Sequence, residues 1–104
     1  MFRTEDLFLG AFALTRGGEL QGVEVREIGS RQMAIFCIDG ADMIEVEREY
    51  HRGRTVVDLR LLKTEVARLK NLAFETLRRE RARVAGDRRR EEYRGIGLSG
   101  GRDR

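Results

Sequence analysis

The spacing of apolar and polar residues along the chain predicts where helices and strands form. Between Thr4 and Gly18 the apolar residues recur with the period of a helix, and they are Leu7, Phe8, Ala11, Phe12 and Leu14. Thr4 is a residue type that caps helix starts, and Gly17 with Gly18 stops a helix. This segment is therefore predicted to be a core helix.

Between residues 20 and 39 the period changes to two. Val23 and Val25 alternate with charged residues, which is typical of a strand with one buried face. Residues 33–38 are apolar on both faces, and Gly29 with Ser30 forms a turn before them. The pattern predicts a β-hairpin whose second strand is the more buried.

A second helix is predicted after the hairpin. Asp39 or Asp42 caps its start, and Gly53 ends it. Its inner side carries Met43, Val46 and Tyr50. The β-favouring residues 54–58 then either add a third strand or form an extended link to the next element.

The longest element begins after Asp58, which is expected to cap it. Its apolar stripe recurs at helical spacing and comprises Leu62, Val66, Leu69, Leu72, Ala73 and Leu77. A helix from Asp58 to Ala85 is about 42 Å long, longer than a body of this size needs. Because the stripe thins after Leu77, the far end is expected to project, to pack on a second copy or to fray.

Together these patterns predict an α+β fold with a helix, a β-hairpin, a helix, an optional short third strand and a long C-terminal helix. Both early helices and the long helix are expected to cover one face of the hairpin. Residues 1–77 form the small domain, and residues 78–94 are an arginine-rich helical extension. Residues 95–104 are expected to be a flexible glycine-rich tail.

Three stretches of the chain resemble a small bacterial and phage family of unknown function: "TEDLFLGAFALTRGGELQGVE", "AIFCID" and "YHRGRTVVDLRLLKTEVARLKNLAFE". The matching features are Phe2, Thr4, Asp6, Leu7, Gly18, Leu20, Tyr50, Val57, Asp58, Leu69 and Lys70. The resemblance covers residues 2 to 75. It implies an α+β domain built on structural residues and carries over no active site. The arginine-rich segment lies outside it.

Composition limits the chain to one small domain with a modest core. It has 104 residues, of which 40% are hydrophobic and 38% are charged. No apolar run has the length of a membrane span, and the N-terminus lacks the pattern of a secretion signal. We therefore expect a cytoplasmic protein without a membrane partner.

One glycine motif has a context that argues against nucleotide binding. Gly95, Gly97 and Gly100 match the dinucleotide pattern G-x-G-x-x-G. That site needs a preceding strand, a following helix and an acid about 20 residues further on. Here a charged segment precedes the glycines and only residues 101–104 follow them, so we expect a tail and no nucleotide site.

A metal site is also not expected. The candidate magnesium ligands are Asp39, Asp42, Glu45 and Glu47. Residues two apart on a helix point away from each other, however, so Glu45 and Glu47 do not converge. The two aspartates have a simpler role as helix caps.

The remaining candidates for catalysis are the single histidine and the single cysteine. His51 lies near a helix end and has no recognisable nucleophile beside it, so we expect a surface position. Cys37 alternates with apolar residues on a strand, so we expect a small core residue. We therefore predict no enzyme activity and no cofactor.

Positive charge is concentrated at the C-terminal end. The net charge of the chain is +3, but residues 78–104 hold ten arginines and five acids, which is +5, and leave −2 for residues 1–77. The candidate phosphate-binding residues are Arg78, Arg79, Arg81, Arg83, Arg88, Arg89, Arg90 and Arg94. Acids interleaved with these arginines favour a solvated helix instead. No aromatic ladder accompanies them, because Tyr93 is alone.

Two functions remain open at this point. The first is a non-catalytic adaptor or accessory protein of phage or mobile-element type, which presents its long helix to itself or to another protein. Leu72 and Leu77 would then be interface residues. The second is a nucleic-acid-binding accessory protein whose arginines hold phosphates of DNA or RNA without reading sequence.

Overall fold

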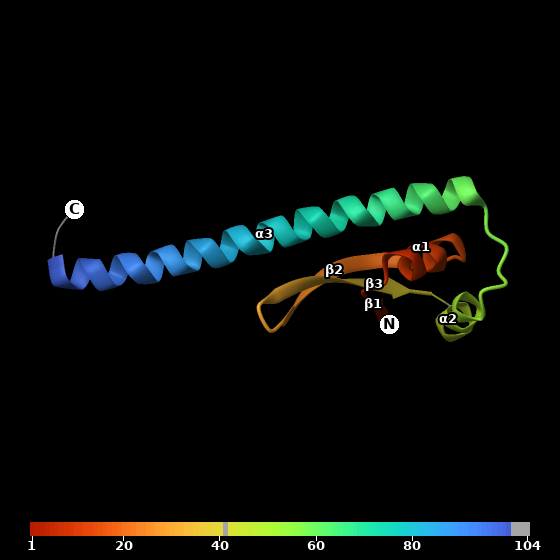
Figure 1. Cartoon of the computed structure of the whole chain (residues 1–104), viewed down its shortest axis with the longest axis horizontal. Helices are drawn as coiled ribbons and strands as arrows, with labels where there is room; N and C mark the ends of the chain where they lie inside the picture. The colour runs from red at the N-terminus through yellow and green to blue at the C-terminus, as the bar shows by residue number, and fades with distance from the viewer. Residues whose placement is uncertain (41, 101–104) are drawn as a thin grey trace.

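Three antiparallel strands form one sheet, and a long helix runs along it (Figure 1). The computed structural model describes the backbone of residues 1–40 and 42–100 and the side chains of residues 1–40 and 42–86. The elements in chain order are β1 (Phe2–Thr4), α1 (Leu7–Thr15), β2 (Glu19–Ile28), β3 (Arg31–Asp39), α2 (Met43–Arg52) and α3 (Leu59–Gly100). This arrangement is the predicted α+β fold.

The predicted hairpin is confirmed as β2 and β3, with β3 in the centre of the sheet. Val23 lies opposite Phe36, and Val25 lies opposite Ala34. Gly29 makes the turn in the left-handed conformation. This conformation costs little free energy for glycine, because glycine has no side chain. All four residues from Ile35 to Ile38 are buried, so the second strand is the more buried one, as expected.

The third strand is β1, which pairs with β3 through Phe2 and Thr4. Residues 54–58 form the extended link, the second of the two alternatives for that segment. The Arg16 guanidinium holds this link, because its Nη2 donates to the Thr55 hydroxyl and to the Val56 carbonyl, each at 2.9 Å. The link is thus bonded to the side chain of Arg16, the C-cap residue of α1, and not to a neighbouring strand.

The predicted cap of the first helix is wrong. Thr4 belongs to β1, so the chain is still extended there and the helix starts later. Asp6 is the N-cap, and its Oδ1 accepts hydrogen bonds from the backbone of Phe8 at 3.0 Å and Leu9 at 3.1 Å. Asp6 also accepts a hydrogen bond from the Tyr50 hydroxyl at 3.2 Å, which ties α2 to the start of α1.

The predicted stop at Gly17 and Gly18 is confirmed. The Gly18 amide donates to the Ala13 carbonyl at 2.9 Å, and the Gly17 amide donates to the Leu14 carbonyl at 3.3 Å. These two bonds form a Schellman motif, in which Gly17 takes a left-handed φ of 93°. A Cβ added at Gly18 would lie 2.8 Å from the Ala13 carbonyl oxygen and 2.7 Å from Ile38, so this turn packs tightly on the sheet.

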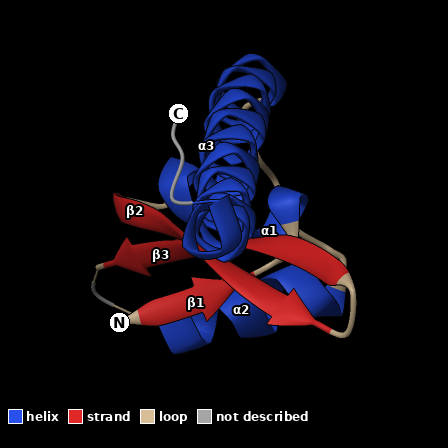
Figure 2. Ribbon diagram, turned by 90° about the vertical axis from the view of Figure 1, so that its left-hand side faces the viewer, coloured by secondary structure: helices blue, strands red, loops and turns tan. Residues whose placement is uncertain are grey.

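The core lies where α1 is enclosed between β3 and α3. Ile38 of β3 and Leu69 of α3 are both fully buried. Gly10 of α1 lies between them, since an added Cβ would lie 3.2 Å from Leu69 and 3.7 Å from Ile38. The view along α3 shows this helix crossing over the strands (Figure 2). Glycine and alanine in α1 therefore allow α3 to approach the sheet closely.

The second helix, α2, packs mainly against α1 and less against the hairpin face than expected. Met43 and Val46 are buried, and Gly53 ends the helix with a φ of 80°, as predicted. The predicted capping by aspartate is wrong. Asp42 stands at the N-cap position in a left-handed conformation and makes no side-chain cap bond, while Asp39 accepts from the Gly40 amide.

The long helix, α3, starts as predicted, with the Asp58 carboxylate accepting from the Leu61 amide at 3.1 Å. Its backbone continues past the expected end at Ala85 and through Gly95 to Gly100. A single Gly86 costs about 1 kcal/mol relative to alanine, and the arginines and glutamates that follow are good helix formers. The rest of the expected tail, residues 101–104, lies outside the described residues.

Substitution of Gly18 by Ala tests the tight turn between α1 and β2. The added methyl group meets a backbone carbonyl that cannot move aside, so we expect a loss of about 1–3 kcal/mol in the free energy of unfolding. Gly22 has no atom within 4 Å of its added Cβ, so Gly22→Ala is the matched control and should cost nothing. Equal melting temperatures for the two variants would contradict this packing.

The bond between Tyr50 and Asp6 predicts a pH dependence. Burial and the Asp6 carboxylate raise the pKa of Tyr50, so the folded state holds the phenol proton more tightly than the unfolded state. Stability is then lost as pH rises above about 10, where the unfolded tyrosine ionises. Thermal melts between pH 8 and pH 11 should show a smaller loss for Tyr50→Phe than for the natural chain. Parallel pH curves for the two proteins would contradict this assignment.

Candidate nucleic-acid interface

The apolar stripe of α3 faces the body of the protein. Leu69 is fully buried, and Leu62, Val66 and Ala73 pack against the same core cluster. The two residues expected at a protein interface, Leu72 and Leu77, are half-buried. Leu77 borders a groove shared with Met33 and Phe36 of β3, so the stripe is largely used in folding.

The acids of α3 are all paired with arginines of the same helix, within the part of it whose side chains are described. Glu65 pairs with Arg68 at 3.3 Å, Glu75 pairs with Arg79 at 3.5 Å, and Glu80 binds Arg83. These pairs are three or four residues apart, as neighbours on a helix surface are. The hydrogen bond from Arg83 lowers the pKa of Glu80 below its ordinary value.

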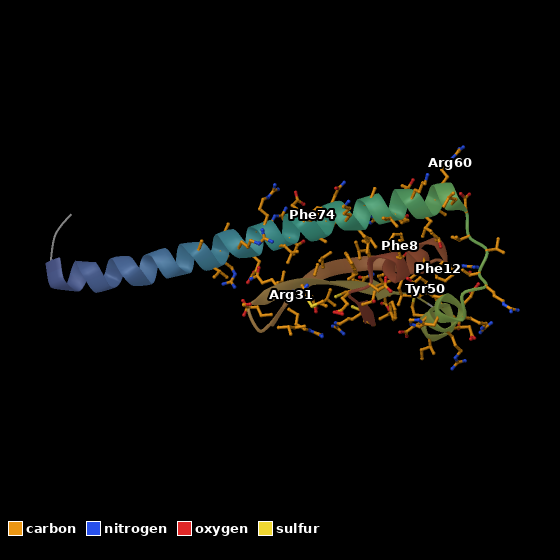
Figure 3. The ribbon with its side chains drawn as sticks, in the orientation of Figure 1. Phe8, Phe12, Arg31, Tyr50, Arg60 and Phe74 are labelled. Carbon is orange, nitrogen blue, oxygen red and sulfur yellow. The ribbon has the colours of Figure 1, made fainter. Side chains whose placement is uncertain are left out.

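The other cations of the described helix lie together on one of its sides. They are Arg60, Lys63, Lys70, Arg78 and Arg81, which we call the basic face. Their spacings of three, seven, eight and three residues place them on one side of a helix with 3.6 residues per turn. All five are exposed, and none has an ion pair or a side-chain hydrogen bond with another described residue. Arg60, at the start of α3, points away from the body (Figure 3).

The structure therefore divides the arginines that the sequence grouped together. Arg78 and Arg81 belong to the basic face, whereas Arg79 and Arg83 are ion-paired on another side of α3. The other four candidates, Arg88, Arg89, Arg90 and Arg94, are on the helical backbone, but their side chains lie outside the described residues.

Sequence reasoning missed Arg60, Lys63 and Lys70, because it looked for a dense run of arginine. The signal that finds them is helical spacing, with cations recurring on one side while the acids of the same helix fall elsewhere. It also missed Arg31 in the hairpin. Arg31 and Arg81 line the same hollow of about 550 Å³ where α3 passes the hairpin turn.

An apolar groove of about 330 Å³ lies beside the basic face. Its apolar lining comprises Leu7 at the start of α1, Met33, Ala34 and Phe36 of β3, and Ala73, Phe74 and Leu77 of α3. The charged residues that line it are Glu5 and Lys70. Phe74 is 61% exposed and lies near the middle of the described part of α3 (Figure 3). An aromatic ring thus borders both the groove and the cations.

Three of the four acids considered as metal ligands line one open hollow, but they do not form a metal-binding group among the described residues. Glu45 pairs with Arg48 at 3.4 Å, and Glu47 lies 3.8 Å from His51. Asp39 and Asp42 line an open hollow with Glu45 at the start of α2. Among the residues that the structure describes, no three histidines, cysteines or acids are grouped as metal ligands.

The two residues considered as nucleophile or base lie in different environments. His51 is exposed on α2 and contacts the ring of Tyr50 edge-on. Cys37 is buried on β3, as predicted. Burial raises the pKa of the Cys37 thiol, and Glu24 adds to this effect while Arg3 opposes it. A buried thiol with a raised pKa is mostly protonated at neutral pH and is a poor nucleophile.

No protein-family model, curated protein or solved structure matches this chain. Within the described residues, no helix is both long and apolar enough to cross a membrane. Function must therefore be inferred from the residues themselves, and the most distinctive surface among them is the basic face of α3.

Proposed function

We propose that this protein is a non-catalytic accessory protein that binds nucleic acid through the basic face. The observation that supports this most is the separation of charge on α3. Its three acids between residues 59 and 86 each pair with an arginine, and five further cations share one exposed side of the helix without an ion pair among the described residues. Such a surface attracts a polyanion.

The dimensions of the basic face suit a phosphate backbone. From Arg60 to Arg81 the helix rises about 32 Å at 1.5 Å per residue. Duplex DNA carries one charge per about 1.7 Å of its axis, so a face of this length passes several phosphates. Lysine and arginine contacts to phosphate position a protein without reading the bases. The binding is therefore independent of sequence.

The protein-adaptor function is a second proposal, and the length of α3 favours it. The helix passes the hairpin turn near Val84 and Ala85, and its backbone continues to Gly100 (Figure 1). Residues 86–100 of this helix, which we call the arm, extend beyond the sheet and offer a surface to a partner protein or to a second copy. The half-buried positions of Leu72 and Leu77 shift the proposed contact from those leucines to the arm.

A salt titration with two charge-matched triple variants tests the nucleic-acid proposal. K63Q/K70Q/R78Q removes three cations of the basic face, whereas R68Q/R79Q/R83Q removes three arginines that are ion-paired. For duplex DNA, the slope of log affinity against log salt should become shallower by about 0.9 for each phosphate that the variant no longer neutralises. We expect a change of about 2–3 for the first variant and a clearly smaller change for the second.

The charge-matched pair separates a specific face from general attraction, because both variants lower the net charge equally. Equal slopes for the two variants would indicate a diffuse effect of net charge and would contradict a binding face. Absence of binding by the natural chain at low salt would reject the nucleic-acid function altogether.

Light scattering tests the adaptor proposal. If the arm mediates self-association, the full chain should form dimers or larger species at high concentration, whereas a chain ending at Gly86 should stay monomeric. Thermal melting of both forms checks that the shorter chain keeps the fold. A full chain that stays monomeric up to about 1 mM would argue against self-association through the arm. At that concentration, a dimer with a binding free energy of about −4 kcal/mol or stronger would be detected.

A further inference from the structure

The central feature of the basic face is an exposed aromatic ring. Phe74 follows Lys70 by four residues and precedes Arg78 by four, so the three side chains lie on one side of α3, one turn apart. At 61% exposure, Phe74 is among the most exposed large apolar residues of the described chain. Neither Lys70 nor Arg78 has an ion pair with a described residue. Phe74 is thus an apolar contact flanked by two available cations.

The groove beside Phe74 adds an apolar wall to this contact. Leu7, Met33 and Phe36 line it from the N-terminal segment and the sheet, and Lys70 lines it from the helix. Its lining of apolar residues beside one lysine suits a group with an apolar face, joined to a negatively charged chain that Lys70 attracts. Glu5 also lines the groove and repels anions, so the phosphates are expected on the Lys70 side.

We propose that Phe74 stacks on an unpaired base at this groove, so that the protein prefers single-stranded nucleic acid to duplex. This inference rests on the proposed nucleic-acid function and specifies its ligand. In a duplex the bases are stacked on each other, and Phe74 meets only the sugar–phosphate backbone. A single strand presents the face of a base to the ring and its phosphates to Lys70 and Arg78.

The preference that follows is moderate and independent of base identity. Phe74 is the only aromatic residue of α3 between residues 59 and 86, so this face stacks one base and has no ladder of rings. Every base has a face that can stack, so the contact does not select a sequence. The cations supply the salt-dependent part of the affinity. Phe74 supplies the part that distinguishes single-stranded nucleic acid from duplex.

The test compares the natural chain and its variants on two labelled probes by fluorescence anisotropy. The probes are an oligothymidine of ~20 nucleotides and a mixed-sequence duplex of ~20 base pairs, each longer than a typical single-strand site. Phe74→Ala should weaken binding to the single strand at least about fivefold, the low end for loss of one stacked base. Binding to the duplex should change less than about twofold, and both salt slopes should persist because no cation is removed.

Two further variants control for the loss of an aromatic ring. Phe8 of α1 is 55% exposed and lies outside both the groove and the basic face, so Phe8→Ala should leave both affinities unchanged. Phe74→Tyr keeps a stacking ring and should retain most of the preference for the single strand. Equal melting temperatures for the natural chain and Phe74→Ala show that any loss of binding does not come from unfolding.

The outcomes distinguish this inference from the proposed function. A natural chain that binds neither probe overturns both. If the protein binds both probes and Phe74→Ala has no effect, only the stacking contact is overturned. The same holds if Phe74→Ala weakens binding to both probes equally. If light scattering shows a dimer that Phe74→Ala separates into monomers, the groove is a surface between two copies, and the inference is also overturned.

Discussion

The close packing of α1 between β3 and α3 is the constraint on which the other features depend. Gly10 has no side chain, so Leu69 of α3 reaches the same core as Ile38 of the sheet. Leu69 is fully buried there, and its burial sets the rotation of α3 about its own axis. A larger residue in place of Gly10 would push α3 away from the sheet or would require its side chains to repack. Every outer position of the helix follows from this contact.

The rotation of α3 separates three chemical classes of residue. The apolar residues face the core, the paired acids and arginines occupy one flank, and the basic face with Phe74 is exposed beside the apolar groove. The exposed ion pairs contribute little to stability, since solvent and salt screen them. Their more important effect is on the surface potential, because they neutralise the acids and leave the cations of the basic face uncompensated.

Several polar residues and one glycine act at joints between elements. Asp6 caps α1 and accepts a hydrogen bond from Tyr50, and Asp58 caps α3. Gly18 closes the turn between α1 and the sheet. Such residues explain how the elements are joined and carry no information about a ligand. The proposed function rests instead on the exposed cations of α3, which make no ion pair with a described residue.

The sequence by itself determined the hairpin, the apolar faces of α2 and α3 and the Asp58 cap, because these depend on local periodicity and capping chemistry. It did not determine the buried face of α1, because Phe8 of the predicted stripe is 55% exposed, whereas Leu9 outside that stripe is buried. It did not determine β1, since three residues carry too little periodicity and their pairing with β3 is a long-range contact. Nor did it show which arginines are available, because that depends on local ion pairs and on how α3 is rotated. The sequence placed many cations near the C-terminus, whereas the tertiary structure placed Arg60, Lys63 and Lys70 on the same face as Arg78 and Arg81, with Phe74 between them. Packing of Leu69 against α1 and the sheet leaves that face exposed, and only a folded core can impose such an orientation.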